Sequence, residues 1–182
     1  MRKLLVSFVF IFLSTFYCIS QTYLKWNAAY WILGITNMSV ETKLSNKWTF
    51  NTDLVVSPWE SVDGNPFLFG MIMPEARFYP KQAFNGFYIG VFGVAQIFKM
   101  TKWNYINTGK HQKGRGFGAG LSLGYEIKIN ERWGIDAFGG WGWQNSQYWG
   151  YYTQTNEKYK EWNGSGEWMP YKIGFSLSYK LK

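Results

Sequence analysis

The sequence Y-K-I-G-F-S-L-S-Y-K-L-K, residues 171–182, alternates between two kinds of side chain. Odd positions carry tyrosine, isoleucine, phenylalanine and leucine, whereas even positions carry lysine, glycine and serine. Because successive side chains of a strand point to opposite faces, the stretch predicts a β-strand with one apolar and one polar face. A strand of a soluble sandwich can alternate in the same way. The length and the aromatic at the far end favour a transmembrane β-strand, which needs about 9–11 residues.

The composition of the whole chain agrees with a strand protein at an apolar–aqueous boundary. Aromatic residues make up 21% of its 182 residues, with 11 tryptophans and 13 tyrosines, and these two types gather where one side is apolar and the other is wet. The mean hydropathy of -0.23 fits a barrel, because alternating strands keep the average low. The length is sufficient for one domain.

The first twenty residues have the pattern of a cleaved signal peptide. Arg2 and Lys3 provide the charged start, residues 4–16 form an apolar run, and Cys18-Ile19-Ser20 supplies small residues at the two positions that a signal peptidase reads. The apolar run is too short for a membrane-spanning helix, which needs about 20 residues. We therefore expect cleavage before Gln21 and two parts, a signal peptide over 1–20 and a barrel domain over 21–182.

Cleavage at this position changes the chemistry that the mature chain can offer. Cys18 is the only cysteine, so its removal excludes disulfides, thiol catalysis and thiolate metal sites, and bulky Tyr17 argues against lipidation of Cys18. Loss of two positive residues lowers the formal net charge from +8 to +6. The remaining basic excess suits contact with outer-membrane lipid, including the phosphates of lipopolysaccharide. In that compartment we expect no nucleic-acid partner.

Eight segments have strand patterning, and their connections alternate in length. Short connections follow the second, fourth and sixth strands, and longer polar ones follow the third, fifth and seventh, over 58–66, 99–113 and 144–167. This pattern predicts an all-β fold, an eight-stranded antiparallel up-and-down transmembrane β-barrel. Pro74 predicts a bulge within the fourth strand, and the register of the fifth is open. The predicted strands cover residues 23–33, 38–44, 48–57, 67–79, 87–98, 114–128, 133–143 and 171–182.

Charged residues within these strands share the parity opposite to the apolar one, namely Lys25, Glu41, Lys43, Asp53, Glu75, Arg77, Glu126, Lys128, Asp136 and Lys172. On a lipid face near the midplane, a lysine or arginine would cost roughly 2–4 kcal/mol. The interior of an eight-stranded barrel is just wide enough for side chains to fill it. We therefore predict a lumenal ion-pair network, with a transport path as the alternative. Its members are Lys25, Asp53, Glu75, Arg77, Glu126, Lys128 and Asp136.

Outward aromatic residues gather near the strand ends. Trp26, Trp48, Phe78, Phe87, Tyr125, Trp133 and Tyr179 lie toward the short turns, and Trp141, Trp143, Trp168 and Tyr171 lie toward the longer connections. Two such girdles are typical of membrane barrels. Further aromatic residues in the long connections suit contact with a protein or a glycan, or else cover the barrel mouth. These candidates are Trp103, Tyr105, Tyr148, Trp149, Tyr151, Tyr152 and Trp162.

Several short motifs recur in a characteristic order: Lys25-Trp26-Asn27, Asn46-Lys47-Trp48, Pro58-Trp59, Glu75-Ala76-Arg77-Phe78, Phe84-Asn85-Gly86, Gly90-Val91-Phe92-Gly93 and the glycine-rich residues 114–124. In this order the mature chain resembles a family of Bacteroidetes outer-membrane proteins catalogued as domain of unknown function 3575. The resemblance implies a small outer-membrane barrel and leaves its activity open. Family members often carry histidine just after the Phe-x-Gly turn. Phe87 and Tyr88 stand there, so no role of those histidines transfers.

Three functional hypotheses follow from these patterns. The first is a non-enzymatic outer-membrane barrel that is structural or presents its external loops to a partner. The second is a lipid-modifying barrel enzyme; His111 is the only histidine, and no motif places a nucleophile and an acid beside it. The third is a soluble, exported, lipocalin-like binder. A single histidine and no mature cysteine argue against a transition-metal site, and we expect no cofactor.

Overall fold

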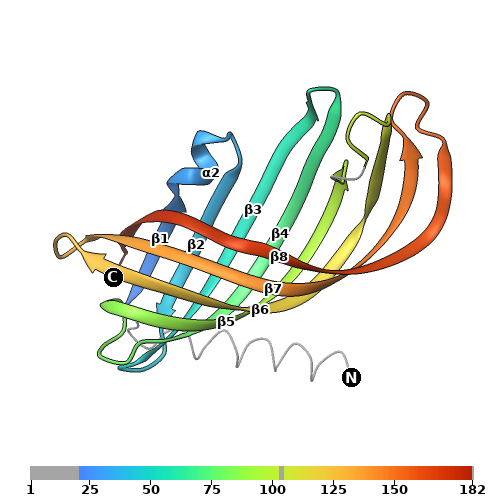
Figure 1. Cartoon of the computed structure of the whole chain (residues 1–182). Coiled ribbons are helices and arrows are strands. Elements are labelled where there is room, and N and C mark those ends of the chain that lie inside the picture. Colours follow the sequence, from blue (N-terminus) through green and yellow to red (C-terminus); the bar gives the residue numbers. More distant parts are fainter. Residues whose placement is uncertain (1–20, 103–104, 182) are drawn as a thin grey trace, which may run out of the picture.

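The computed structural model describes residues 21–102 and 105–181, and within them the chain forms eight strands and one short helix (Figure 1). The strands form one antiparallel sheet in sequence order, and the sheet closes because β8 also pairs with β1. The predicted signal peptide and Trp103 lie outside the described residues. The elements are β1 (Thr22–Asn27), α2 (Ala28–Ile32), β2 (Thr36–Lys43), β3 (Trp48–Val62), β4 (Asn65–Phe78), β5 (Gly86–Met100), β6 (Lys110–Lys128), β7 (Trp133–Tyr152) and β8 (Lys158–Lys180).

The predicted alternation holds through most of the barrel wall. In β3, for example, Thr49, Asn51 and Asp53 are buried, whereas Trp48 and Leu54 on the other parity are exposed. The fifth strand, whose register the sequence left open, places Tyr88, Phe92 and Val94 inside. No helix of the described residues is long and apolar enough to cross a membrane.

Two predicted loops, 58–66 and 144–167, are wrong, because most of each segment remains in paired strands, and the predicted loop 99–113 is too long at both ends. β3 and β4 continue to a turn at Asp63–Gly64, and β7 and β8 continue to a turn over residues 153–157. Similarly, only residues 101–109 connect β5 to β6. In Figure 1 these hairpins extend well past β1 and β2. Alternation between apolar and polar residues reveals a strand only where the two faces of the strand differ in polarity. Toward the ends of these hairpins both faces carry a mixture of polar and apolar residues, so the sequence pattern did not indicate strands there.

The first predicted strand, residues 23–33, is also wrong in its second half. β1 ends at Asn27, and the chain then turns into α2. The Asn27 side chain accepts a hydrogen bond from the Ala29 amide at 3.0 Å, which is the usual N-cap contact. Ala28 and Ala29 are the best helix formers. Capping and propensity together override the apolar alternation that continued past Asn27.

The sheet has an irregularity at a different place from the one that the sequence predicted. Pro74 causes no bulge, because β4 and β5 keep one register on both sides of it. Instead, the register between β7 and β8 shifts, since Gly140 pairs with Lys172 and Trp141 with Pro170. This bulge leaves one extra residue, Tyr171, on β8, so Tyr171 and Lys172 both point inward. The prediction of Tyr171 as an outward girdle residue is therefore wrong.

The interior consists of successive layers along the barrel axis. Nearest the short turns lies an aromatic cluster of Tyr23, Tyr79, Ala83, Phe84 and Tyr88. Charged side chains follow, and beyond them lies an apolar layer of Ile35, Val55, Met73, Phe92, Val94 and Tyr171. The order is fixed by the strands, because each step of two residues along a strand moves one level along the same face. The side chains of all three layers are buried.

Candidate functional site: the interior ion-pair network

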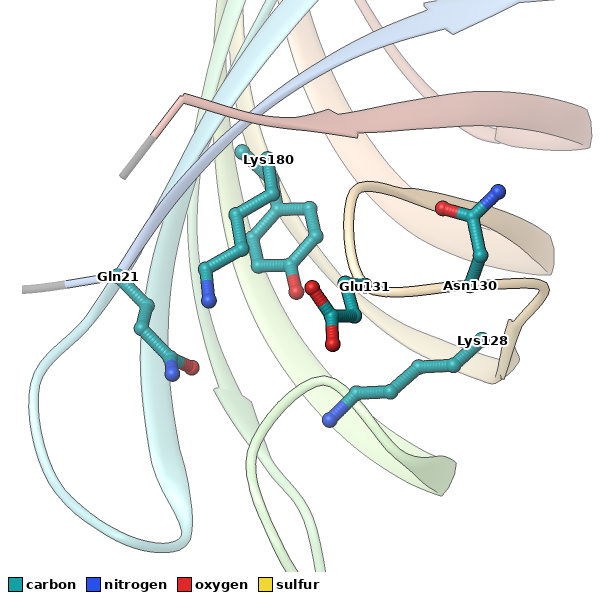
Figure 2. A pocket seen from close by; sticks show the side chains of 6 residues that line it. Gln21, Lys128, Asn130, Glu131 and Lys180 are labelled. Atoms are coloured by element: carbon teal, nitrogen blue, oxygen red, sulfur yellow. The ribbon is translucent and has the colours of Figure 1, made fainter.

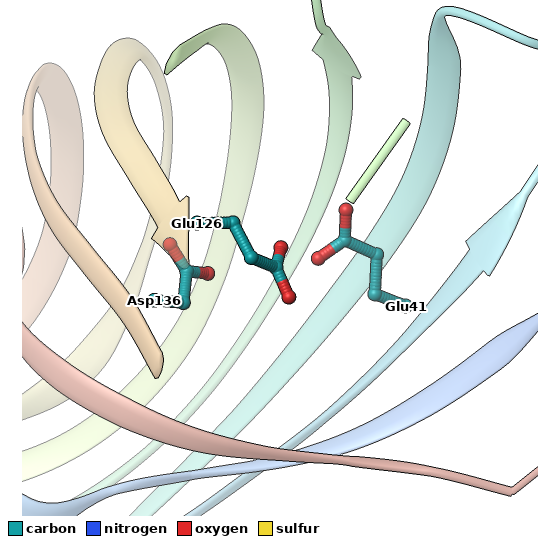
Figure 3. A group of neighbouring side chains, drawn as sticks. All are labelled: Glu41, Glu126 and Asp136. Carbon is teal, nitrogen blue, oxygen red and sulfur yellow. The ribbon is translucent and has the colours of Figure 1, made fainter. Parts of the chain in front are cut away.

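Lys25 on β1 lies at the centre of the charged layer. Its Nζ atom is 2.6 Å from Glu41 on β2, 2.8 Å from Glu126 on β6 and 3.0 Å from Asp136 on β7. Figure 3 shows these three carboxylates pointing into one region of the interior. All four side chains are at most 1% exposed, so the group is shielded from bulk water.

Arg77 on β4 supplies the second cation of the network. Its Nη1 atom is 2.7 Å from Glu41 and 2.9 Å from Asp136, and its Nε atom is 2.8 Å from Glu75. The guanidinium carbon also lies 4.5 Å from the ring centroid of Tyr88, a cation–π contact. Arg77 therefore joins the carboxylates around Lys25 to Glu75.

Lys172 on β8 continues the network toward the apolar layer. Its Nζ atom is 2.6 Å from Glu75 and forms a second ion pair with Asp53 on β3. Tyrosines also contact the carboxylates: the Tyr79 hydroxyl lies 3.0 Å from both Glu41 and Glu126 and shares its one proton between them, and Tyr88 donates to Asp136 at 3.0 Å. With Tyr88 on β5, every strand contributes at least one side chain.

The structure brings together six of the seven side chains predicted for this network, and it excludes Lys128. Lys128 is the last residue of β6, two positions beyond Glu126, and it is exposed. It lies at the barrel end around an open cavity with Lys180, Glu131 and Gln21 (Figure 2). The parity of Lys128 was predicted correctly. However, Lys128 lies at the end of the strand, beyond the charged layer. Glu41 and Lys172 belong to the network and have the predicted inward parity, but the prediction of network members did not include them.

The same acids raise the question of a metal site. Glu41, Glu126 and Asp136 offer oxygen atoms within 4.8 Å of one another. However, each of these carboxylates already binds Lys25 Nζ. The lysine ammonium therefore occupies the position between these carboxylates that a metal cation would take. Removing one partner from such a buried network typically costs about 3–5 kcal/mol.

The predicted external aromatic residues do not form a single cluster. Trp149 packs edge-on against Trp162 with ring centroids 4.7 Å apart. A second group contains Tyr105 and Tyr152, which both pack on Tyr159, while Tyr148 lies beneath Lys102 at 4.7 Å. Of the predicted residues, therefore, Trp149 and Trp162 pack on each other, and Tyr105 and Tyr152 share Tyr159 as a neighbour. Trp162 and Tyr152 remain 49% and 42% exposed, which leaves them available to a partner.

The His111 ring contacts an aromatic ring and a hydroxyl, and no carboxylate among the described residues hydrogen-bonds it. The ring is buried and stacks on Tyr151 with centroids 5.6 Å apart. Its Nδ1 atom is 3.3 Å from the hydroxyl of Thr153, and its Nε2 atom has no hydrogen-bond partner among the described residues. A nucleophile–base–acid arrangement is therefore not assembled around it.

These features define a closed eight-stranded antiparallel barrel with a buried ion-pair network between two apolar clusters and with an apolar outer face. The chain belongs to the family described as Protein of unknown function (DUF3575), whose family model matches residues 5–181. This match confirms the resemblance carried by the short motifs. Comparison with curated proteins and with solved structures found no match.

Proposed function

We propose that this protein is a non-enzymatic barrel of the outer membrane. The observation that carries the proposal is its outer face, which is apolar on every side of the barrel. Outward residues of six different strands are between 43% and 63% exposed, namely Val40, Leu54, Ile72, Val91, Leu121 and Phe175. Soluble monomers rarely expose contiguous apolar surface of more than a few hundred Å². A hydrocarbon environment removes the cost of this surface.

The opposite arrangement would be needed for a soluble lipocalin-like binder. Such a protein keeps its apolar parity inside and its charged parity in water. Here Lys25, Glu41 and Arg77 are buried, while Leu121 and Leu123 are 61% and 54% exposed. The outward aromatic pair Trp133 with Tyr179 lies at the short-turn end, and the pair Trp143 with Trp168 lies midway along β7 and β8; two such levels suit the two membrane interfaces.

Two parts of the proposal concern the envelope. Residues 1–20 act as an export signal, and the mature chain inserts with the long hairpins on the outer surface. There Lys158, whose side chain is 46% exposed, can meet lipopolysaccharide phosphates, and exposed Trp162 and Tyr152 can contact a protein or a glycan. The buried ion pairs, which occupy the charged layer of the interior, support a structural or presenting role over transport.

A non-enzymatic role is supported by the surroundings of His111. The alternative of a lipid-modifying enzyme predicts altered envelope lipids when the gene is deleted. Unchanged lipid profiles in the deletion strain are the expected result, and a lost lipid species would contradict the proposal.

Membrane insertion can be tested directly. We expect the protein to fractionate with the outer membrane, to begin at Gln21, and to migrate faster on a detergent gel before boiling than after it. Recovery in the soluble periplasm, or equal mobility with and without boiling, would overturn the proposal.

A further inference from the structure

The barrel wall has one interruption, which the short first two strands create. β1 pairs with β8 only as far as Asn27 with Ser176, and β2 pairs with β3 only as far as Thr36 with Val56. β8 extends past this level to Lys158, and β3 extends to Val62. Beyond Asn27, therefore, no strand of the described chain joins β8 to β3. The residues 27–35 that fill this interval, with α2 at their centre, are called the seam (Figure 1).

A few side-chain hydrogen bonds hold the seam on the β8 side, in place of a ladder. The Asn27 amide donates to the Ile173 carbonyl at 3.1 Å, and the Tyr30 hydroxyl donates to the Tyr171 carbonyl at 3.2 Å. Unpaired backbone groups facing hydrocarbon cost several kcal/mol each. These two contacts therefore satisfy carbonyls that a neighbouring strand would satisfy elsewhere in the wall.

The β3 side of the seam is held similarly. The Trp59 indole donates to the Leu33 carbonyl at 3.1 Å, and the Trp31 indole donates to the Asn37 carbonyl at 3.0 Å. The Trp59 ring lies where a side chain at Gly34 would project, and Gly34 has a φ of +67°, so only glycine fits both constraints. The seam is thus attached by individual contacts and not by a continuous ladder.

The seam covers the apolar layer of the interior. Ile35 at its end belongs to that layer, and the ring of Tyr30 packs against it. Val55 on β3 and Tyr171 on β8, which flank the interval, are layer members as well. Tyr30 and Ile35 therefore separate the apolar interior from the outside of the barrel. The charged layer lies on the other side of Val55, toward the short turns.

The outside of the seam is continuous with the apolar outer face. Trp31, Ile32 and Leu33 are 54%, 85% and 61% exposed. Trp31 donates a hydrogen bond to the carbonyl of Asn37, the residue before outward Met38, which is also exposed. If the barrel spans the outer membrane, the seam borders hydrocarbon on one side and an apolar interior on the other.

We propose that the seam is a lateral gate through which the acyl chain of a membrane lipid enters the apolar layer. Outward movement of α2 withdraws Tyr30 and Ile35 and exposes Val55 and Phe92 to the bilayer. Hydrocarbon is the occupant that matches both surfaces, because it needs no hydrogen bonds and is already present at the entrance. This inference rests on the proposed membrane location.

The test uses single cysteines in the mature chain, which contains none of its own. Val55→Cys reports on the apolar layer, and Ser122→Cys, in the charged layer and equally buried, is the matched control. Each variant is folded into phospholipid vesicles and treated with a long-chain alkyl maleimide dissolved in the bilayer. Tyr30→Phe, which removes only the hydroxyl bound to Tyr171, is then added to each.

We expect the bilayer reagent to label Val55→Cys, and Tyr30→Phe to speed this labelling about two- to tenfold, the effect of one lost hydrogen bond on an opening equilibrium. Ser122→Cys should stay unlabelled in both backgrounds. Unchanged labelling of Val55→Cys on adding Tyr30→Phe, or equal labelling of Ser122→Cys, would overturn the gate. So would equal acceleration with a charged, water-soluble maleimide, because entry would then be through the aqueous mouth.

A third position separates failure of the gate from failure of the membrane proposal. Leu121→Cys lies on the outer face, where the leucine is 61% exposed. If the bilayer reagent labels Leu121→Cys but not Val55→Cys, the barrel spans the bilayer and the gate is wrong. If Leu121→Cys is not labelled, the membrane location itself is wrong.

Discussion

Lys25 and Glu126 form an ion pair of 2.8 Å across the barrel interior, although 101 residues separate them in the chain. β1 and β6 do not pair with each other, so this contact forms only when the sheet has closed. The same holds for Lys25 with Asp136 on β7. The charged layer therefore links closure of the sheet to the burial of its most polar side chains.

The first prediction tests Lys25 as the centre of that layer. Lys25→Met keeps similar volume but leaves Glu41, Glu126 and Asp136 without their shared cation, so we expect a loss of about 3–5 kcal/mol of unfolding free energy. Urea unfolding of the barrel folded in vesicles measures it. Lys128→Met is the matched control, because Lys128 is exposed beyond the layer, and it should change stability by no more than about 0.5 kcal/mol. Equal effects of the two substitutions would contradict the central role of Lys25.

The second prediction concerns a glycine that makes room for Tyr88. A side chain at Gly124 on β6 would collide with the Tyr88 ring, which holds Arg77 and Asp136. Gly124→Ala should therefore displace that ring, and overpacking of this kind typically costs about 1–3 kcal/mol. Gly139→Ala is the control, since nothing lies within 4 Å of its added carbon. A stable Gly124→Ala variant would show that Tyr88 moves freely.

Much of the fold was accessible from the sequence because one face of each strand is apolar and the other is not. Lys25, Asp53, Glu126 and Asp136 could be assigned to the interior because neighbouring apolar residues fix their parity. The pattern of the fourth strand did not decide the faces of Glu75 and Arg77, and their inward assignment was a choice, which their burial confirms. Parity does not give the level along the axis. Lys128 was therefore grouped with residues that lie deeper.

The features that were missed depend on local backbone contacts. The Asn27 cap starts α2 within an apparently continuous alternation, and the shift at Gly140 and Trp141 turns Tyr171 inward. Neither the cap nor the register shift is visible in the hydropathy of the residues around it. The seam combines both features, because Tyr30 of α2 binds Tyr171 of the bulge. Apolar–polar alternation could not predict the seam, because the seam forms where capping and a bulge, and not alternation, determine the backbone.

The third prediction tests the aromatic cluster at the short-turn end. Phe84 is fully buried and packs on Tyr23 with ring centroids 4.4 Å apart. Phe84→Ala should cost about 3–5 kcal/mol, the usual range for a buried phenylalanine. Phe175→Ala on the outer face, where phenylalanine is 63% exposed, should cost clearly less in the same urea experiment. Similar losses for both would show that Phe84 does not support the barrel end.

The last prediction assigns the two faces of β8. Ser176 and Leu177 are neighbours, and the serine is 3% exposed inside the barrel while the leucine is 41% exposed outside it. In a bilayer, Leu177→Arg places a guanidinium in hydrocarbon and should cost roughly 2–4 kcal/mol, depending on depth. Ser176→Arg places the same group in the polar interior, where overpacking costs about 1–3 kcal/mol but nearby carboxylates offer partners. We therefore expect Leu177→Arg to fold into vesicles with the lower yield.

The same pair of variants in different solvents separates a lipid-facing surface from a merely exposed one. In vesicles, urea midpoints should fall further for Leu177→Arg than for Ser176→Arg. In detergent micelles, whose thin and adaptable apolar layer lets a long side chain reach water, the penalty of Leu177→Arg should shrink. Overpacking by Ser176→Arg does not depend on the surrounding solvent, so its penalty should persist. Equal midpoints of the two variants in vesicles, or failure of Ser176→Arg alone, would reverse the assignment of faces and remove the main support for a membrane barrel.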